Sequence, residues 1–142
     1  MLIERTVLLI DDDEDDLEML EQALKIIDGN HKIIEAKDGV EGLKKLQELK
    51  NKSTLPCLIV LDINMPRMDG KQTFVSIKAD KMLSKIPVVI FSTSTSLLDR
   101  TFFERHHTAY FVKPVNFTAL ATTASRMIRH CIHKTDGQNE IS

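Results

Sequence analysis

Tryptophan is absent from this 142-residue chain, and there is one tyrosine and only two cysteines. Cys57 and Cys131 lie far apart and neither belongs to a Cys-x-x-Cys pair, so the sequence favours two buried thiols over a disulfide or a metal site. No apolar run approaches the ~18 residues of a membrane span. The first run ends in acids, which excludes a signal peptide. The sequence therefore predicts a cytoplasmic protein without a membrane segment.

The chain also lacks a strong charge of either sign. It has 19 Lys and Arg against 21 Asp and Glu, a net charge of −2, and no basic stretch interleaved with aromatic residues. This pattern predicts no nucleic-acid partner. The apolar share of 42% and the charged share of 28% are ordinary for a globular domain with a core of its own.

Short apolar runs alternate with helical periods along the chain, and no internal repeat interrupts the order. Strands that alternate with helices predict a parallel sheet with helices on both faces, an α/β doubly wound fold. The pattern fills residues 1–134 as one domain, and the polar residues 135–142 are expected to fray. The expected strands are Thr6–Ile10, Lys32–Ala36, Cys57–Asp62, Ile86–Ser92 and Ala109–Val112. The expected helices are Leu17–Ile27, Val40–Leu49, Phe74–Lys81, Ser94–His106 and Phe117–Ile132.

Polar residues follow four of the five expected strands at the point where each strand ends. In an open α/β sheet, ligands bind outside the carboxyl ends of the strands, so these side chains should converge on one edge. The set comprises Asp11 and Asp12 after the first strand, Asp62 at the end of the third, Ser92 at the end of the fourth and Lys113 after the fifth.

Three carboxylates held close together repel one another unless a cation lies among them. Oxygen ligands suit Mg²⁺, and a carboxylate kept ionised beside it can attack phosphorus to give an aspartyl phosphate. A lysine ammonium would neutralise charge on the transferring phosphoryl group, and a hydroxyl would bond to the product. The constellation is therefore suited to accepting a phosphoryl group in a Mg²⁺-dependent reaction.

Four motifs, LLIDDDE, LIVLDINMPRMDG, PVVIFSTS and YFVKP, resemble the receiver domain of bacterial response regulators. The resemblance covers about residues 5 to 133 and implies a flavodoxin-like (βα)5 sheet with strand order 2-1-3-4-5. The region from LIVLDINMPRMDG to FSTS is most similar to stand-alone regulators that partner phytochrome-type histidine kinases.

The resemblance implies a role for seven positions and a bond geometry for one more. Ser92 departs from the family, in which threonine is commoner, and Thr93 offers a competing register that the count from Pro87 disfavours. The Lys113–Pro114 bond corresponds to one that is commonly cis. The implied roles are Asp62 as phosphoryl acceptor, Asp11 and Asp12 as Mg²⁺ ligands together with Asp62 and the backbone carbonyl of Asn64, Ser92 and Lys113 as groups that contact the phosphoryl, and Ser92 and Tyr110 as switch residues.

The same resemblance implies the partners. A histidine kinase or phosphotransfer protein would donate the phosphoryl group, and the surface of the fourth helix, fifth strand and fifth helix would change its affinity for an output protein of unknown identity. Receivers often pair through that face, so a homodimer is an open expectation. The chain would catalyse only its own phosphorylation and dephosphorylation, and without an output domain it would not bind DNA through a helix-turn-helix.

Other interpretations of the same residues stay open. Asp13 to Asp16 are expected to start the first helix, where acids favour the positive end of the dipole, and Asp62 alone could cap a turn. A flavodoxin-type cofactor binder would need a phosphate loop where this chain has acids. A phosphoaspartate phosphatase would need a second acid where this chain has Asn64. A degenerate receiver acting as a phosphorylation-independent adaptor is the main alternative.

Overall fold

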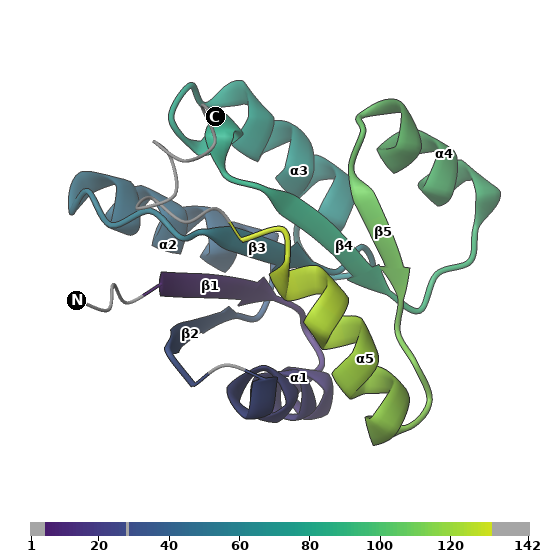
Figure 1. The fold of residues 1–142 in the computed structure, drawn as a ribbon. Helices are drawn as coiled ribbons and strands as arrows, with labels where there is room; N and C mark the ends of the chain where they lie inside the picture. The colour runs from purple at the N-terminus through teal and green to yellow at the C-terminus, as the bar shows by residue number, and fades with distance from the viewer. Residues whose placement is uncertain (1–4, 28, 132–142) are drawn as a thin grey trace, which may run out of the picture.

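A computed structural model describes residues 5–27 and 29–131, which form one five-stranded parallel sheet in the order β2-β1-β3-β4-β5 (Figure 1). This confirms the α/β doubly wound fold. Residues 135–142 lie outside the described residues. Among the described helices, none has the length and apolar character needed to cross a membrane. The strands are β1 (Arg5–Ile10), β2 (His31–Ala36), β3 (Leu58–Leu61), β4 (Val88–Ser92) and β5 (Ala109–Val112). The helices are α1 (Glu14–Ile27), α2 (Gly39–Asn51), α3 (Gly70–Ala79), the 3-10 turn η1 (Leu83–Lys85), α4 (Leu97–Arg105) and α5 (Phe117–Ile128).

β3 is apolar throughout and β1 is apolar from Val7 to Ile10, because both faces of the sheet are covered there. Successive side chains of a strand point to opposite faces, so Val7 and Leu9 of β1 pack on one side and Leu8 and Ile10 on the other. Helices α1 and α5 cover the first face, and α2, α3 and α4 cover the second (Figure 1). Two apolar layers thus hold the strands in register and fix where each strand ends.

Short polar side chains begin most of the helices, directly after the loops at the carboxyl edge of the sheet. Asp38, Ser96 and Asn116 each accept a hydrogen bond from a backbone N–H of the first turn. Asp69 and Gln72 bond each other's backbone in a capping box at the start of α3. These caps satisfy N–H groups that have no partner inside the helix, and they position the loops around the edge.

Three expectations about local geometry were wrong. α4 begins at Leu97 and not at Ser94, because Ser96 caps it and Ser94 is held in the preceding loop. α5 ends at Ile128, before the expected Ile132. The described residues contain no cis peptide bond, so the Lys113–Pro114 bond is trans, the ordinary form of an amide bond.

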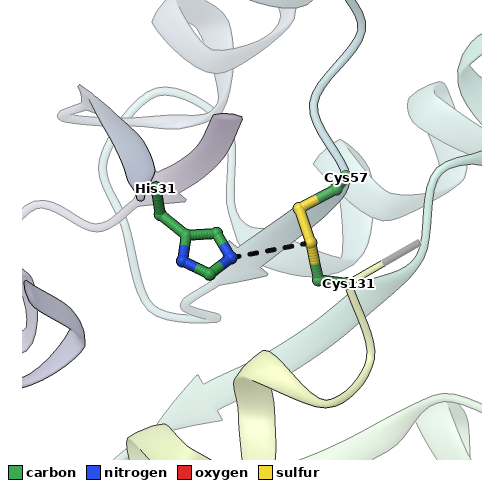
Figure 2. The surroundings of a disulfide bond; sticks show 3 residues. All are labelled: His31, Cys57 and Cys131. Atoms are coloured by element: carbon green, nitrogen blue, oxygen red, sulfur yellow. Dashed lines mark hydrogen bonds between the residues drawn. A yellow bond between two sulfur atoms is a disulfide. The ribbon is translucent and has the colours of Figure 1, made fainter. Parts of the chain in front are cut away.

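The expectation of two separate thiols was also wrong, because Cys57 and Cys131 form a disulfide (Figure 2). Cys57 directly precedes β3, and Cys131 follows the C-terminal end of α5. Both segments reach the amino edge of the sheet, the edge opposite the acids, where their Cα atoms lie 4.7 Å apart. Their separation of 74 positions along the chain hides this proximity in the sequence.

Candidate functional site

The acids that follow β1 and β3 meet at the carboxyl edge of the sheet. Backbone hydrogen bonds continue past the strand ends, from the Asp11 N–H to the Ala36 carbonyl (3.0 Å) and from the Asp62 N–H to the Ile10 carbonyl (2.9 Å). Carboxylate oxygens of Asp11, Asp12 and Asp62 all lie within 4.8 Å of one another. The structure therefore brings together the three carboxylates that the sequence pattern placed at this edge.

Lys113 reaches this cluster from the end of β5, where its N–H donates to the Ser92 carbonyl (2.9 Å). Its Nζ lies 2.7 Å from Asp11 Oδ2 and 3.4 Å from Asp62 Oδ2. The side chains of all three residues are only 8% exposed. One buried ammonium thus bridges two buried carboxylates.

Asp16 is a member of the site that the sequence interpretation left out. It was assigned only to the start of the first helix, yet its Oδ2 lies 2.8 Å from Lys113 Nζ. Asp16 is in the first turn of α1, whereas Asp12 lies before the helix begins. Its contact with Lys113 depends on how α1 packs beside β5, and no local spacing in the sequence signals it.

Asp13 belongs to the start of the first helix, as expected, while the ligand role of Asp11 and Asp12 stays a prediction. Asp13 Oδ1 accepts from the N–H groups of Asp15 and Asp16 (3.0 and 3.1 Å), so Asp13 caps α1. The Asp13 N–H in turn donates to Asp11 Oδ1 (2.9 Å). Asp13 therefore orients Asp11 through its backbone while its own carboxylate serves the helix.

The backbone around Asp62 is closely packed. The Ile63 N–H donates to Asp62 Oδ1 (2.8 Å), and the Gly70 N–H donates to the Ile63 carbonyl (2.7 Å). A Cβ at Gly70 would overlap the Asp62 carbonyl oxygen and would lie 2.6 Å from Ile63 Cα. Glycine thus lets the start of α3 approach the Asp62 backbone and fix its position.

The loop from β3 to α3 is fastened from the side of α2. Arg67 in this loop donates to Asp38 Oδ2 through Nε (2.8 Å) and Nη2 (2.6 Å). Asn64 is exposed in the same loop, two residues beyond Asp62. A metal-ligating role for its carbonyl stays a prediction.

Burial dominates the electrostatics of the site. It raises the pKa of Asp11 to about 7, with a further contribution from the charge of Asp62, against the opposing effect of Lys113. Burial also raises the pKa of Asp62, although Lys113, the Ile63 N–H and Ser92 favour its charged form. Burial lowers the pKa of Lys113, but the hydrogen bonds that it donates to Asp11 and Asp16 and the charge of Asp62 outweigh this effect, so its pKa lies above the usual value.

Ser92 and Tyr110 lie on the β4 and β5 side of the cluster. β4 ends at Ser92, which is fully buried, whereas Thr93 is exposed, so the expected register holds. Ser92 Oγ accepts from the Ser94 N–H (3.1 Å). The Tyr110 hydroxyl donates to the Ser94 carbonyl (2.8 Å), which ties β5 to the loop after β4. Ser92 and Tyr110 are thus both hydrogen-bonded to the backbone of Ser94.

The donor set can be tested against a divalent metal ion. Four carboxylates, those of Asp11, Asp12, Asp16 and Asp62, face a single ammonium. Lys113 contacts three of them, Asp11, Asp16 and Asp62, so one positive charge faces the negative charges of four carboxylates. This excess of carboxylate oxygen fits a hard divalent cation, which takes oxygen ligands and neutralises such a cluster.

Comparison with known proteins assigns this chain to a family. The family model described as response regulator receiver domain matches residues 7–125. The chain belongs to the response regulator receiver domain family. Its function is that of a response regulator in two-component signalling.

Individual relatives of this receiver agree with the family assignment. Response regulator Rcp1 of Synechocystis sp. is 33% identical over 120 residues, 82% of this chain and 81% of that protein. The phosphorylated cyanobacterial phytochrome response regulator RcpA superposes with a TM-score of 0.81 at 28% identity, over 89% of this chain and 93% of RcpA. The Mn²⁺-bound form of Rcp1 superposes with a TM-score of 0.78 at 29% identity, over 87% and 91% of the two chains. The expected similarity to phytochrome response regulators is confirmed.

Proposed function

We propose that Asp62 accepts a phosphoryl group from a histidine kinase or phosphotransfer protein. The observation that carries this proposal is the setting of Asp62, a buried carboxylate at the end of β3 with the ammonium of Lys113 at 3.4 Å and two further carboxylates within 4.8 Å. The similarity to phytochrome response regulators supports a phytochrome-type histidine kinase as the donor. The chain would catalyse only its own phosphorylation and dephosphorylation.

Each residue of the site has a part in this transfer. The Ile63 N–H holds Asp62 Oδ1, which fixes the carboxylate so that its other oxygen faces Lys113. Lys113 stabilises the charged form of Asp62, and its ammonium would neutralise charge on the transferring oxygens. The buried hydroxyl of Ser92 would bond to the phosphoryl group once it is attached to Asp62.

A divalent cation, Mg²⁺ in our proposal, would be held by Asp11, Asp12, Asp62 and the Asn64 carbonyl. When bound, it supplies positive charge against the phosphoryl oxygens. The Mn²⁺-bound form of the relative Rcp1 supports a divalent ion at this place. Asp16 lies outside this ligand set because the carboxylate oxygens that gather within 4.8 Å of one another are those of Asp11, Asp12 and Asp62.

Phosphorylation would be transmitted through Ser92, Ser94 and Tyr110. If Ser92 moves toward a phosphoryl group, the hydrogen bond that its hydroxyl accepts from the Ser94 N–H must break or shift. The Ser94 carbonyl also accepts the hydrogen bond of the Tyr110 hydroxyl, so the two changes are linked. The loop before α4 would then change position, a population shift biased by one new charge. The surface of α4, β5 and α5 would change its affinity for an output protein.

The same surface is our proposed contact for a second copy of the chain. Leu97 and Leu98 of α4 are each 78% exposed, and Val112 of β5 is 39% exposed. Exposed apolar side chains of this size are suited to an interface. Sedimentation of the phosphorylated and unphosphorylated forms would test the pairing, and a monomer in both forms would contradict it.

The phosphorylation proposal has a direct test. Wild type incubated with acetyl phosphate and Mg²⁺ should gain the mass of one phosphoryl group, and Asp62→Asn should gain none. Asp15→Asn, which removes an exposed acid of the same run, should behave as wild type. Chelation by EDTA should abolish the gain. No labelling of wild type would favour the phosphorylation-independent adaptor instead, and equal labelling of wild type and Asp62→Asn would show that another residue is the acceptor.

A further inference from the structure

The second group of reactive side chains in this molecule lies at the amino edge of the sheet. Cys57 and Cys131 form the disulfide, and the ring of His31 at the start of β2 points at it (Figure 2). His31 Nε2 lies 4.0 Å from Cys131 Sγ. The three residues come from three separate segments, and all are buried. This cluster has no part in the phosphoryl transfer proposed above.

We propose that Cys57 and Cys131 form a reversible dithiol–disulfide site, which tethers the C-terminal end of α5 to the start of β3 when it is oxidised. The inference rests on the cluster itself and is independent of the function proposed for Asp62. The two sites lie at opposite ends of β3, separated by roughly 16 Å of extended strand.

The fold does not depend on this bond for its core, which is why we assign it as reversible. Disulfides are essential chiefly in small domains that cannot build a sufficient core. Here α5 is already anchored by Leu120, Ala124 and Met127 in the apolar layer that also contains β1, β3 and α1. Both cysteines belong to the same layer, and each keeps a small exposed fraction, 8% for Cys57 and 5% for Cys131, whereas Ala124 and Met127 are fully covered. This exposed fraction is where a small reagent would reach the bond.

The reaction balances with a low-molecular-weight disulfide as the oxidant. The thiolate of Cys131 attacks the small disulfide, which forms a mixed disulfide and expels one small thiolate. The thiolate of Cys57 then attacks the Cys131 sulfur, which forms the Cys57–Cys131 bond and expels the second small thiolate. The two cysteines lose two protons, the two small thiolates take them up, and two electrons pass from the chain to the small disulfide.

His31 is a positioning residue in this scheme. In the reduced protein an imidazole beside the Cys131 sulfur would favour its thiolate, since neighbouring histidine lowers the pKa of a thiol. Cys131 would then be the first to react. The three side chains also offer a nitrogen and two sulfurs within 4.8 Å of one another, a donor set that Zn²⁺ accepts, so a metal site is the competing assignment.

The first experiment uses the wild-type chain without denaturant. The protein is equilibrated with mixtures of a small thiol and its disulfide. The exchange is then quenched with acid, free thiols are alkylated, and the mass of the protein is measured by mass spectrometry. Both thiols should become protected together at a single midpoint, and the reaction should reverse when the thiol is returned. A bond that opens only in denaturant, or thiols that are alkylated equally in every mixture, would overturn the proposal.

The second experiment measures the tether. Hydrogen exchange in residues 124–131 should be slower in the oxidised than in the reduced protein, and the melting temperature should be higher by on the order of 10 °C. No mutation is needed, so a variant that fails to fold cannot obscure the result. Identical exchange and melting in the two forms would show that no tether exists.

The third experiment separates the role of His31 from simple packing. Because the chain has two cysteines, Cys57→Ser and Cys131→Ser each leave one reactive thiol. His31→Ala should slow the reaction of Cys131 with a small disulfide several-fold in the Cys57→Ser chain. A residue that only covers the sulfurs would give faster reaction of both single thiols after the same change, which would overturn its positioning role.

The last experiment addresses the metal alternative. Zn²⁺ is added to the reduced wild-type protein and to Cys57→Ser, and binding is followed by calorimetry. The proposal expects no tight binding that requires Cys57 and His31, and unhindered disulfide formation in the presence of the metal. One equivalent of Zn²⁺ bound tightly by wild type, lost in Cys57→Ser and in His31→Ala, would overturn the redox assignment.

Discussion

The two ends of β3 carry opposite kinds of site. Beyond Leu61, at the carboxyl edge, buried charges face one another across the ends of β1, β3 and β5. Before Leu58, at the amino edge, a covalent bond joins two segments beside a continuous apolar layer. The first arrangement costs stability, because burial disfavours the charged forms of Asp11 and Asp62. The second adds stability by restricting the unfolded chain.

This difference shows that a small domain can hold its reactive groups and its stabilising cross-link at opposite edges of one sheet. The loops that follow the strands are free to hold polar groups, while the strands and the helices that cover them keep those groups in place. Changes at the carboxyl edge should therefore alter phosphorylation most, and changes at the amino edge should alter stability most.

The largest effect is expected from Lys113→Ala. This change removes the ammonium that contacts Asp11, Asp16 and Asp62, so phosphorylation by acetyl phosphate should slow by about 100-fold or more. Lys81→Ala removes an exposed ammonium and should have no effect. Cys57→Ser, at the other end of β3, should change the rate by less than about twofold. A large loss in Cys57→Ser would show that the two edges are not separate.

The pH dependence of stability should reveal the raised pKa of Asp11. The folded protein binds the proton of the Asp11 carboxyl more tightly than the unfolded chain does. The contribution of Asp11 to the free energy of unfolding therefore falls as pH rises from about 4 to about 7, and it is constant above that range. Without metal, the stability of wild type relative to Asp11→Asn should therefore decline by up to a few kcal/mol across this interval. Urea unfolding in EDTA at several pH values measures the difference.

Asp80→Asn provides the opposite control for that slope. Hydrogen bonding from Lys50 and from the Leu83 N–H lowers the pKa of Asp80. The contribution of Asp80 to stability is therefore fully present above the pKa that it has in the unfolded chain, and it is lost only in acid. Between pH 5 and 8 the difference between wild type and Asp80→Asn should be flat. A flat difference for Asp11→Asn as well would contradict the account of the buried site.

Gly70→Ala should destabilise the fold by about 1–3 kcal/mol, because a Cβ there overlaps the Asp62 carbonyl and the two backbones must separate. The matched control is Gly29→Ala, whose added Cβ would meet only the Lys25 carbonyl at 3.9 Å. That variant should be neutral or slightly more stable. Equal unfolding free energies in urea for the two variants would show that the close approach at Asp62 is not constrained.

The smallest effect is expected from Tyr110→Phe. It removes the hydrogen bond to the Ser94 carbonyl while the ring keeps its place beside Phe103, so stability should fall by about 1 kcal/mol. Phosphorylation of Asp62 should proceed as in wild type, but the response of the α4, β5 and α5 surface should weaken. Fluorescence of a probe attached to α4, read before and after phosphorylation, would measure that response.

The carboxyl edge was predictable from sequence because strand ends can be read locally. Asp11, Asp62, Ser92 and Lys113 each adjoin an apolar run, and a parallel sheet brings such ends together whatever lies between them. The part of Asp16 was missed because it depends on the rotation of α1 relative to β5. That rotation is set by the packing of α1 against α5, which no local pattern records.

The amino edge was not predictable in the same way. The pairing of Cys57 with Cys131 depends on where α5 ends relative to β3, a relation between segments 74 residues apart. His31 opens β2 and its ring faces Cys131, a contact that no pattern around His31 in the sequence indicates. Isolated cysteines and histidines form no repeating pattern in the sequence, so their proximity becomes visible only in the folded structure.

Locating the phosphoryl group within the chain tests the central claim most directly. Wild type labelled with acetyl phosphate and Mg²⁺ is digested at low pH, and the peptides are fragmented in a mass spectrometer. The account predicts the added mass on Asp62 alone, in the segment that joins β3 to α3. Added mass on Asp11, Asp12 or Ser92, with Asp62 unmodified, would contradict it.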